Sequence, residues 1–172
     1  KKLKEYKVKW KVLNTKDFGI PQNRERIYIV GSVNGANIFD NLKKRESPSL
    51  QEFIDRTDTC RETPQPFIKK RLSKILNEGT VYINAGFNYN GYPNGHLSCP
   101  CLLAGSTHCF FNVHMMRKMN VKEWLMMQGF SLPFTQVVSD RQMKKQIGNS
   151  MSVNVVKEII KELMKIQKIK KN

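Results

Sequence analysis

Apolar and basic residues alternate near the start of the chain, over residues 6–13 (YKVKWKVL). Such alternation is typical of a β-strand that has one face in water. The run IYIVGSV (27–33) is β-branched and aromatic, which predicts a second, buried strand. Gly19 and Pro21 break any regular element between the two, so the polar residues 14–26 should form a loop that presents its side chains between two strands.

The last third of the chain predicts helices. Asn120 followed by Glu123 is a capping-box pattern, which predicts a helix over 121–128. The same logic at Ser139 predicts a second helix, which Gly148 should close.

Apolar residues at helical spacing then predict a long amphipathic helix over 152–169, with lysines on its outer face. The middle of the chain is irregular, apart from a short helix predicted over 66–77 and short strands predicted within 81–111. We therefore expect a strand–loop–strand part, a separate small lobe and a helical return, over residues 1–35, 36–115 and 116–172.

Composition narrows the class of partner. The 172 residues hold 30 Lys+Arg against 14 Asp+Glu, a formal net charge of +16, which favours an anionic partner such as nucleic acid. No apolar run approaches the ~20 residues of a membrane span. Four cysteines without an apolar signal segment indicate reduced thiols in the cytoplasm. The chain begins with Lys rather than Met, as expected of a trimmed or incomplete product.

Two groups of polar residues carry the candidate chemistry. Gln22, Arg24 and Arg26 alternate at the entrance of a strand, which places all three on one side. Arginine offers a rigid, charged fork that suits a phosphate or the carbonyl oxygen of a base. The turn GNSMSVNV (148–155) enters a helix, where free N–H groups and Asn and Ser side chains can bind a polar ligand. Each pattern alone also fits a solvated arginine pair or an ordinary helix cap.

Three segments, taken together and in order, resemble the last three major motifs of DNA (cytosine-5) methyltransferases. They are GIPQNRERIYIVG (19–31), RKMNVKEWLMMQGF (117–130) and KQIGNSMSVNVV (145–156). The intervening residues lie where that family has its variable target-recognition domain. The resemblance implies an α/β fold, with a partial Rossmann-like, S-adenosylmethionine-dependent methyltransferase core and a small, irregular, β-rich recognition domain.

The resemblance also implies roles for single residues. Arg26 is similar to the arginine that reaches the flipped cytosine and its phosphate, and Arg24 and Gln22 are similar to the residues that hold that loop. Arg117 resembles the arginine that braces the recognition domain against the catalytic core. Asn149, Ser150 and Met151 resemble the turn that, in this family, closes over the S-adenosylmethionine pocket.

Within the variable region, PCLLAG (100–105) resembles the end of a recognition domain. The family usually has Thr-Leu there, where this chain has Cys101-Leu102. Loop tips rich in Asn, Tyr and Gly suit base-edge hydrogen bonds and stacking. The candidates for DNA binding are Arg117, Asn88, Tyr89, Asn90, Asn94 and Leu102.

Three elements of the family's chemistry are absent from these residues: the nucleophilic cysteine of a Pro-Cys-Gln turn, the Glu of a Glu-Asn-Val strand, and the Phe-x-Gly-x-Gly cofactor loop. Pro100-Cys101 imitates the nucleophile turn but follows the Gln22–Arg26 motif and precedes Leu-Leu. The family order places the missing motifs upstream of residue 1. The resemblance thus implies double-stranded DNA and a missing N-terminal half as partners, S-adenosylmethionine as cofactor, and no activity of the isolated chain.

Other interpretations stay open. Histidines and cysteines crowd together in the variable region, but their spacing fits no usual zinc finger, so we expect no metal; they are His96, Cys99, Cys101, His108, Cys109 and His114. Cys109-Phe110-Phe111 is a partial match to the Cys-Phe-Thr element of tRNA-methylating relatives. A non-catalytic DNA-binding fragment or subunit is a further alternative. The abundance of Lys, Asn and Ile indicates an AT-rich bacterial or viral genome, and a companion restriction endonuclease is compatible with this family.

Overall fold

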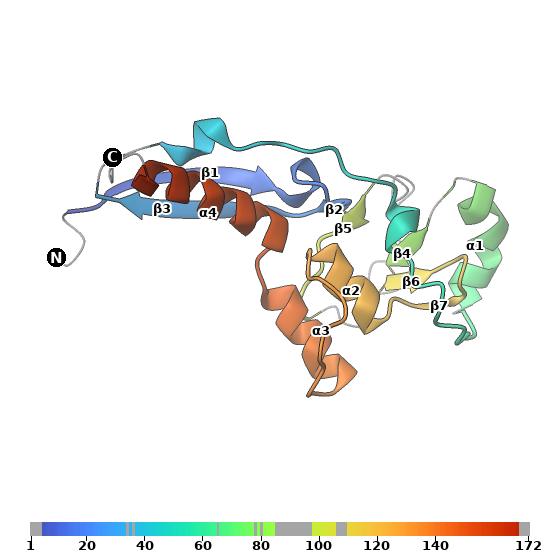
Figure 1. Ribbon diagram of the computed structural model, residues 1–172. Helices are drawn as coiled ribbons and strands as arrows, with labels where there is room; N and C mark the ends of the chain where they lie inside the picture. Colours follow the sequence, from blue (N-terminus) through green and yellow to red (C-terminus); the bar gives the residue numbers. More distant parts are fainter. Residues whose placement is uncertain are drawn as a thin grey trace.

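The computed structural model describes residues 5–33, 35, 37–64, 66–77, 79, 81–84, 98–105 and 110–168. The strands are β1 Lys7–Asn14, β2 Gln22–Asn23, β3 Glu25–Ser32, β4 Tyr82–Asn84, β5 Cys99–Pro100, β6 Phe110–Asn112 and β7 Arg117–Lys118. The α-helices are α1 Pro66–Asn77, α2 Val121–Met127, α3 Asp140–Asn149 and α4 Val153–Lys168. Three short 3-10 helices are η1 Thr15–Asp17, η2 Ile38–Asn41 and η3 Leu50–Phe53. The chain is elongated, with β1, β3 and α4 at one end and α1 at the other (Figure 1).

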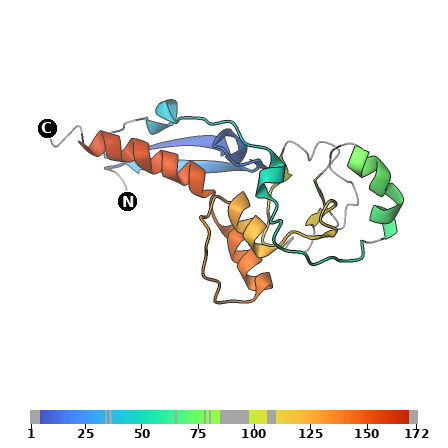
Figure 2. The ribbon, with the colours of Figure 1, turned by 45° about the vertical axis from the view of Figure 1, so that its right-hand side comes forward.

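β1 and β3 form an antiparallel pair that runs from Lys7 opposite Ser32 to Asn14 opposite Glu25. α4 lies along one face of the pair, as Figures 1 and 2 show from two directions. The core between them consists of Leu13, Phe18, Tyr28, Ile38, Phe39, Val155 and Ile159. We call β1, β3, η2 and α4, with this core, the sheet unit. The two strands and the long helix predicted from the sequence are confirmed here.

The other face of the β1–β3 pair is open. Trp10, Ile27 and Ile29 are 66%, 64% and 68% exposed. The register sets Trp10 opposite Ile29 and Val12 opposite Ile27, so these side chains form one apolar surface. The prediction of a buried second strand is therefore wrong for this face, because a single helix covers only one side of a two-stranded sheet.

A second core surrounds Trp124. It contains Leu50, Ile54, Val81, Tyr82, Cys99, Leu102, Phe110, Met119, Val121, Trp124, Leu125, Met127, Met143 and Ile147. We call the elements that share this core the Trp124 unit. Its residues come from both sides of the boundary expected between residues 115 and 116, so a single core spans that boundary. The expected segment limits stay a prediction.

The two helix starts predicted from caps are confirmed. Asn120 Oδ1 accepts a hydrogen bond from the Glu123 N–H, and the Glu123 carboxylate accepts one from the Asn120 N–H, each at 3.0 Å. The Ser139 side chain accepts from the Gln142 N–H. The predicted end of that helix is wrong: α3 continues past Gly148, which does not take the left-handed conformation that ends a helix.

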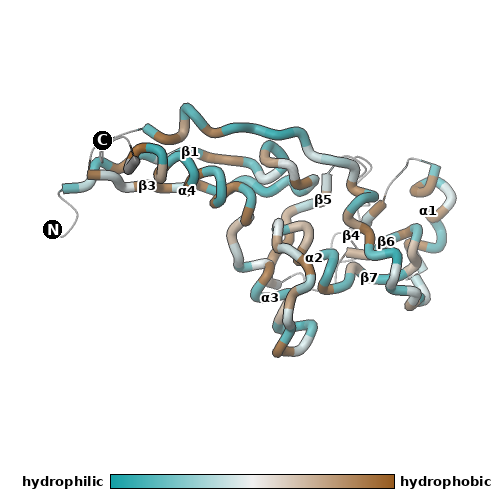
Figure 3. Tube along the Cα trace, viewed as in Figure 1, coloured by the Kyte–Doolittle hydropathy of each residue, from teal (hydrophilic) through white to brown (hydrophobic). Residues whose placement is uncertain are grey.

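A three-stranded antiparallel sheet, in the order β4–β6–β7, packs with α1 at the far end of the molecule. Its core consists of Ile68, Ile75, Ile83, Phe111 and Val113. α1 coincides with the helix predicted over 66–77. A hydrophilic connection runs from η2 to η3 and links the sheet unit to the Trp124 unit (Figure 3). No helix in the described part of the chain is long and apolar enough to cross a membrane.

Candidate functional site

The loop that follows β1 is tied to the centre of the molecule through Gln22. β2 pairs in parallel with β5, which sets Gln22 beside Cys99. The Gln22 side chain is fully buried, and its Nε2 donates a hydrogen bond to the Met127 carbonyl at 2.7 Å. The loop between β1 and β3 therefore docks against the end of α2, in the Trp124 unit.

Arg24 connects three segments that are far apart in the sequence. Its side chain is only 4% exposed. Nη1 donates to the Leu102 carbonyl at 2.7 Å, and Nη2 donates to the carbonyls of Gly148 at 3.0 Å and Ser150 at 2.8 Å. Burial lowers the pKa of the Arg24 guanidinium, while the Cys101 sulfur acts in the opposite direction. One arginine thus joins the Gln22–Arg26 motif, the Cys101-Leu102 segment and the Gly148–Ser150 turn.

Arg26 lies next to Arg24 but is partly exposed. Its Nη1 donates to the neighbouring Glu25 carbonyl at 2.6 Å, and its Nη2 lies 3.2 Å from Cys101 Sγ. Arg24 Nη1 lies 3.3 Å from the same sulfur. The buried, exposed, buried, exposed pattern from Gln22 to Glu25 agrees with the alternation expected from the sequence. The structure brings Arg24 and Arg26 together at Cys101, with only Arg26 partly exposed, while the buried Gln22 side chain is directed to the Met127 carbonyl.

The turn between α3 and α4 lies beside this arginine pair. Asn149 and Met151 are exposed, and Ser150 is partly buried. The Ser150 Oγ donates a hydrogen bond to the Ile147 carbonyl at 2.6 Å. A shallow, mostly apolar pocket of about 500 Å³ opens next to the turn, lined by Phe130, Ser150, Met151, Val153, Val156, Lys157, Ile160 and Lys161. The sequence-predicted turn residues Ser150 and Met151 are therefore part of the wall of a pocket.

Gly148 has a steric role that the sequence analysis missed. A Cβ atom on Gly148 would lie 2.6 Å from the Ala104 nitrogen and 2.8 Å from the Leu103 carbonyl carbon. Both are backbone atoms, so they cannot yield as a flexible side chain would. Only glycine lets the 103–104 backbone approach α3 this closely. The signal for this close approach in the sequence was the turn of small residues that begins at Gly148.

Arg117 is enclosed in the Trp124 unit. It is 2% exposed, and its Nη1 and Nη2 donate to both Glu123 carboxylate oxygens at 3.0 and 2.8 Å. Nη2 also donates to the Asp55 carbonyl at 2.8 Å, and Nε lies 3.4 Å from Asp58 Oδ2. Burial acts to lower the pKa of Arg117, but hydrogen bonding with Glu123, together with the negative charges of Glu123 and Asp58, raises it overall. The pairing of Glu123 with Arg117 was not anticipated, because the capping pattern alone accounted for Glu123.

The residues expected to bind DNA have different positions. Arg117 and Leu102 are buried, at 2% and 0% exposed, so neither side chain reaches a DNA surface in this structure. Asn88, Tyr89, Asn90 and Asn94 lie outside the described residues. The same holds for His96, His108 and Cys109, and the described residues contain no group of three or more His, Cys, Asp or Glu side chains arranged to hold a metal.

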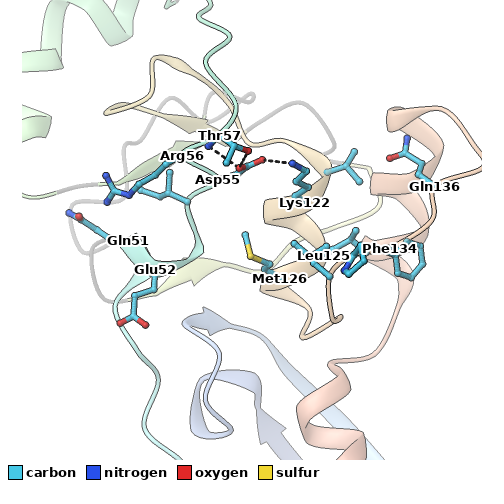
Figure 4. A pocket seen from close by; sticks show the side chains of 14 residues that line it. Gln51, Glu52, Asp55, Arg56, Thr57, Lys122, Leu125, Met126, Phe134 and Gln136 are labelled. Carbon is cyan, nitrogen blue, oxygen red and sulfur yellow. Dashed lines mark hydrogen bonds and ion pairs between the residues drawn. The ribbon is translucent and has the colours of Figure 1, made fainter.

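A larger cavity, of about 960 Å³, lies away from the arginine pair. Leu125, Met126 and Phe134 form part of its apolar wall, and Asp55 lies at its rim, 3.3 Å from Lys122 Nζ (Figure 4). Hydrogen bonds from Thr57 and Asn120 also reach the Asp55 carboxylate. Among the described residues, none that the sequence predicted to form a site lines this cavity.

Known proteins provide an independent comparison. Residues 1–94 and 87–165 match the family model described as C-5 cytosine-specific DNA methylase. The Type II methyltransferase M.NgoBI of Neisseria gonorrhoeae is 32% identical over 163 residues, which are 88% of this chain and 49% of that protein. M.HaeII of Haemophilus aegyptius is 32% identical over 161 residues, 90% of this chain and 49% of that protein. The chain spans about half the length of these curated relatives.

Solved structures agree in fold. The S. pombe Dnmt2 methyltransferase superposes with a TM-score of 0.59 at 19% identity, over 95% of this chain and 58% of that chain. A Spodoptera frugiperda DNMT2 mutant superposes with a TM-score of 0.60 at 18% identity, over 93% and 58%. The methyltransferase fold expected from the three motifs is confirmed.

Proposed function

Because the chain belongs to the family of C-5 cytosine-specific DNA methylases, we propose that it is the C-terminal part of a DNA (cytosine-5-)-methyltransferase. The complete enzyme would methylate C5 of a cytosine that is flipped out of a specific sequence in double-stranded DNA. The observation that carries the proposal is the Arg24 junction, because it unites the Gln22–Arg26 motif, the Cys101-Leu102 segment and the Gly148–Ser150 turn in one place.

Arg26 is the proposed catalytic residue of this chain. Its partly exposed guanidinium can meet the carbonyl oxygen of the flipped base and the adjacent phosphate. A cysteine from the other half of the enzyme would add to C6 of the ring, and charge that develops on the base would then lie beside Arg26. Arg24 and Gln22 support the loop from within, since both are buried and hydrogen-bonded to carbonyl groups.

The residues at the turn fit one wall of a cofactor site. Asn149 is exposed, and Ser150 and Met151 border the apolar pocket beside α4, a combination that suits a ligand with polar groups and a flat aromatic ring. S-adenosylmethionine would supply an electrophilic methyl group there. The residues of this chain would only hold and orient it, because the glycine-rich loop expected for its other side belongs to the half that these residues do not include.

Sequence recognition is assigned to residues 45–115. The proposal rests on the absence of family motifs there, on loop residues that suit base edges, and on a basic chain that can contact phosphates. Asn88, Tyr89, Asn90 and Asn94 remain the proposed base-reading residues. Arg117 is proposed to brace this region rather than to touch DNA, because its donors are all directed to protein oxygens.

The proposed partner is the N-terminal half of the catalytic domain, in the same polypeptide or as a second subunit of a cytoplasmic enzyme. The open face of the β1–β3 pair supports this proposal, since a contiguous exposed apolar surface marks an interface. β3 also has the continuous apolar run of a strand that is buried on both faces, whereas β1 carries the lysines of an edge strand. We therefore expect the isolated chain to be poorly soluble and inactive.

The test is transfer of tritium from labelled S-adenosylmethionine into DNA. The chain alone should transfer none, and the chain joined to the N-terminal half of the N. gonorrhoeae relative (the joined enzyme) should be active. Arg26→Ala in the joined enzyme should slow turnover, because it should raise the activation free energy by roughly 1–3 kcal/mol or more. An inactive joined enzyme would contradict the proposal, and transfer by the purified chain alone would make Cys101 a candidate nucleophile.

A further inference from the structure

The thiol of Cys101 lies between the two arginines of the site. Its sulfur is 3.3 Å from Arg24 Nη1 and 3.2 Å from Arg26 Nη2, and the thiol can donate to the Leu102 carbonyl at 3.8 Å. A neutral thiol can accept and donate hydrogen bonds at the same time. Cys101 is partly exposed, so the sulfur is at the edge of the site rather than in the core.

The two arginines depend on this sulfur to different degrees. Arg24 also donates to three carbonyl groups, and it is held without the thiol. The only other hydrogen bond of the Arg26 guanidinium, within the described part of the chain, goes to the carbonyl of its own neighbour Glu25. Cys101 therefore provides the one described hydrogen bond that ties the Arg26 guanidinium to a distant segment.

We propose that Cys101 is a positioning residue, whose thiol holds the Arg26 guanidinium at the mouth of the site and links the end of the recognition region to the reacting base. The inference rests on the proposed function, because Arg26 is the proposed catalytic residue. Cys101 takes no part in bond formation and acts through Arg26 alone. The hydroxyl that the resemblance places at this position in relatives offers the same donor and acceptor pattern, which explains how a thiol can stand there.

A mutant cycle in the joined enzyme separates this role from simple packing. Cys101→Ala should lower kcat about tenfold or more and leave the KM for S-adenosylmethionine unchanged, because a hydrogen bond to a charged group is lost. The same substitution in an Arg26→Ala background should have little further effect. Cys101→Thr should retain most of the activity, and Val137→Ala, at a side chain that is 87% exposed and outside the site, should retain all of it. Equal losses in both backgrounds would overturn the proposal.

A second measurement does not depend on methyl transfer. Phenylglyoxal modifies accessible arginine guanidiniums, and mass spectrometry reports the rate at each position. In Cys101→Ala, labelling of Arg26 should accelerate several-fold, whereas Arg24 should stay protected by its carbonyl acceptors; Cys101→Thr should restore the slow rate. If the joined enzyme transfers no methyl group, the proposed function fails, but these rates still decide the placement of Arg26. Unchanged Arg26 labelling in Cys101→Ala would overturn the inference.

Discussion

The sheet unit and the Trp124 unit differ in how completely they are built. In the Trp124 unit, Trp124 is buried on all sides and the enclosed Arg117–Glu123 pair has protein partners for its charged atoms. In the sheet unit, α4 covers one face of β1 and β3, and Trp10 and Ile29 stand open on the other. The Trp124 unit therefore encloses its charged pair within this chain, whereas the sheet unit leaves an apolar face uncovered, as an interface would. Substitutions at buried positions of the Trp124 unit should therefore lower the free energy of unfolding strongly. Substitutions on the open face of the sheet unit should change it little.

The largest effect on stability is expected from Glu123→Ala, in the Trp124 unit. The substitution leaves the Arg117 guanidinium buried without its carboxylate, which should lower the free energy of unfolding by about 3–5 kcal/mol. Urea unfolding of the joined enzyme measures it. Glu62→Ala is the matched control: Glu62 pairs with Lys118 at 2.9 Å on the surface, and its loss should cost no more than about 1 kcal/mol. Similar losses of stability in the two variants would contradict the view that the Arg117–Glu123 pair is enclosed.

Gly148→Ala tests the close approach of α3 to the backbone of residues 103–104. The new Cβ would collide with the backbone of residues 103–104, so the free energy of unfolding should fall by about 1–3 kcal/mol. Methyl transfer should fall as well, since Arg24 binds the Gly148 carbonyl. Gly105→Ala is the control, because nothing lies within 4 Å of a Cβ there. If Gly148→Ala changed neither the free energy of unfolding nor methyl transfer, the backbone of residues 103–104 would have room to move away from α3.

Acid should weaken the Trp124 unit through Asp55. Burial acts to raise the pKa of Asp55, but hydrogen bonds from Thr57 and Asn120 outweigh it and bring the pKa from 3.8 to about 2. A carboxyl with a lowered folded-state pKa stabilises the fold above its unfolded pKa, and this contribution is lost as the pH falls through the range from 3.8 to about 2. Asp55→Asn should remove on the order of 1 kcal/mol of the pH-dependent stability between pH 5 and 2, as measured by urea unfolding at each pH. An unchanged pH profile in Asp55→Asn would assign the acid sensitivity to other groups.

The smallest effect on stability is expected from Ile29→Lys, on the open face of the sheet unit. In the isolated chain it should change the free energy of unfolding by no more than about 0.5 kcal/mol and should raise solubility, since Ile29 is already exposed. In the joined enzyme the same charge would lie in an interface, so assembly and methyl transfer should be lost. Tyr28→Lys, on the face that α4 covers, should destabilise both proteins. A fully active Ile29→Lys joined enzyme would show that the open face is an ordinary surface.

Much of the local structure could be predicted from the sequence. The capping box at Asn120, the cap at Ser139 and the helix over 66–77 depend on interactions within a few residues, and all three are present. The three motifs, in their order, also sufficed to identify the family and the fold. These features are readable because their physical causes, which are helix capping and the spacing of apolar residues, act between neighbours in the chain.

The rest was decided by contacts between distant residues. The run Ile27–Val30 is apolar at every position, so its periodicity could not show which face of β3 would be covered; the placement of α4 settled it. Arg24 finds its acceptors at Leu102, Gly148 and Ser150, and Cys101 meets both arginines, only because β2 pairs with β5 and α3 packs against the 103–104 backbone. Hydrogen bonds and close backbone approaches of this kind depend on positions in space, and no local pattern of residues specifies them.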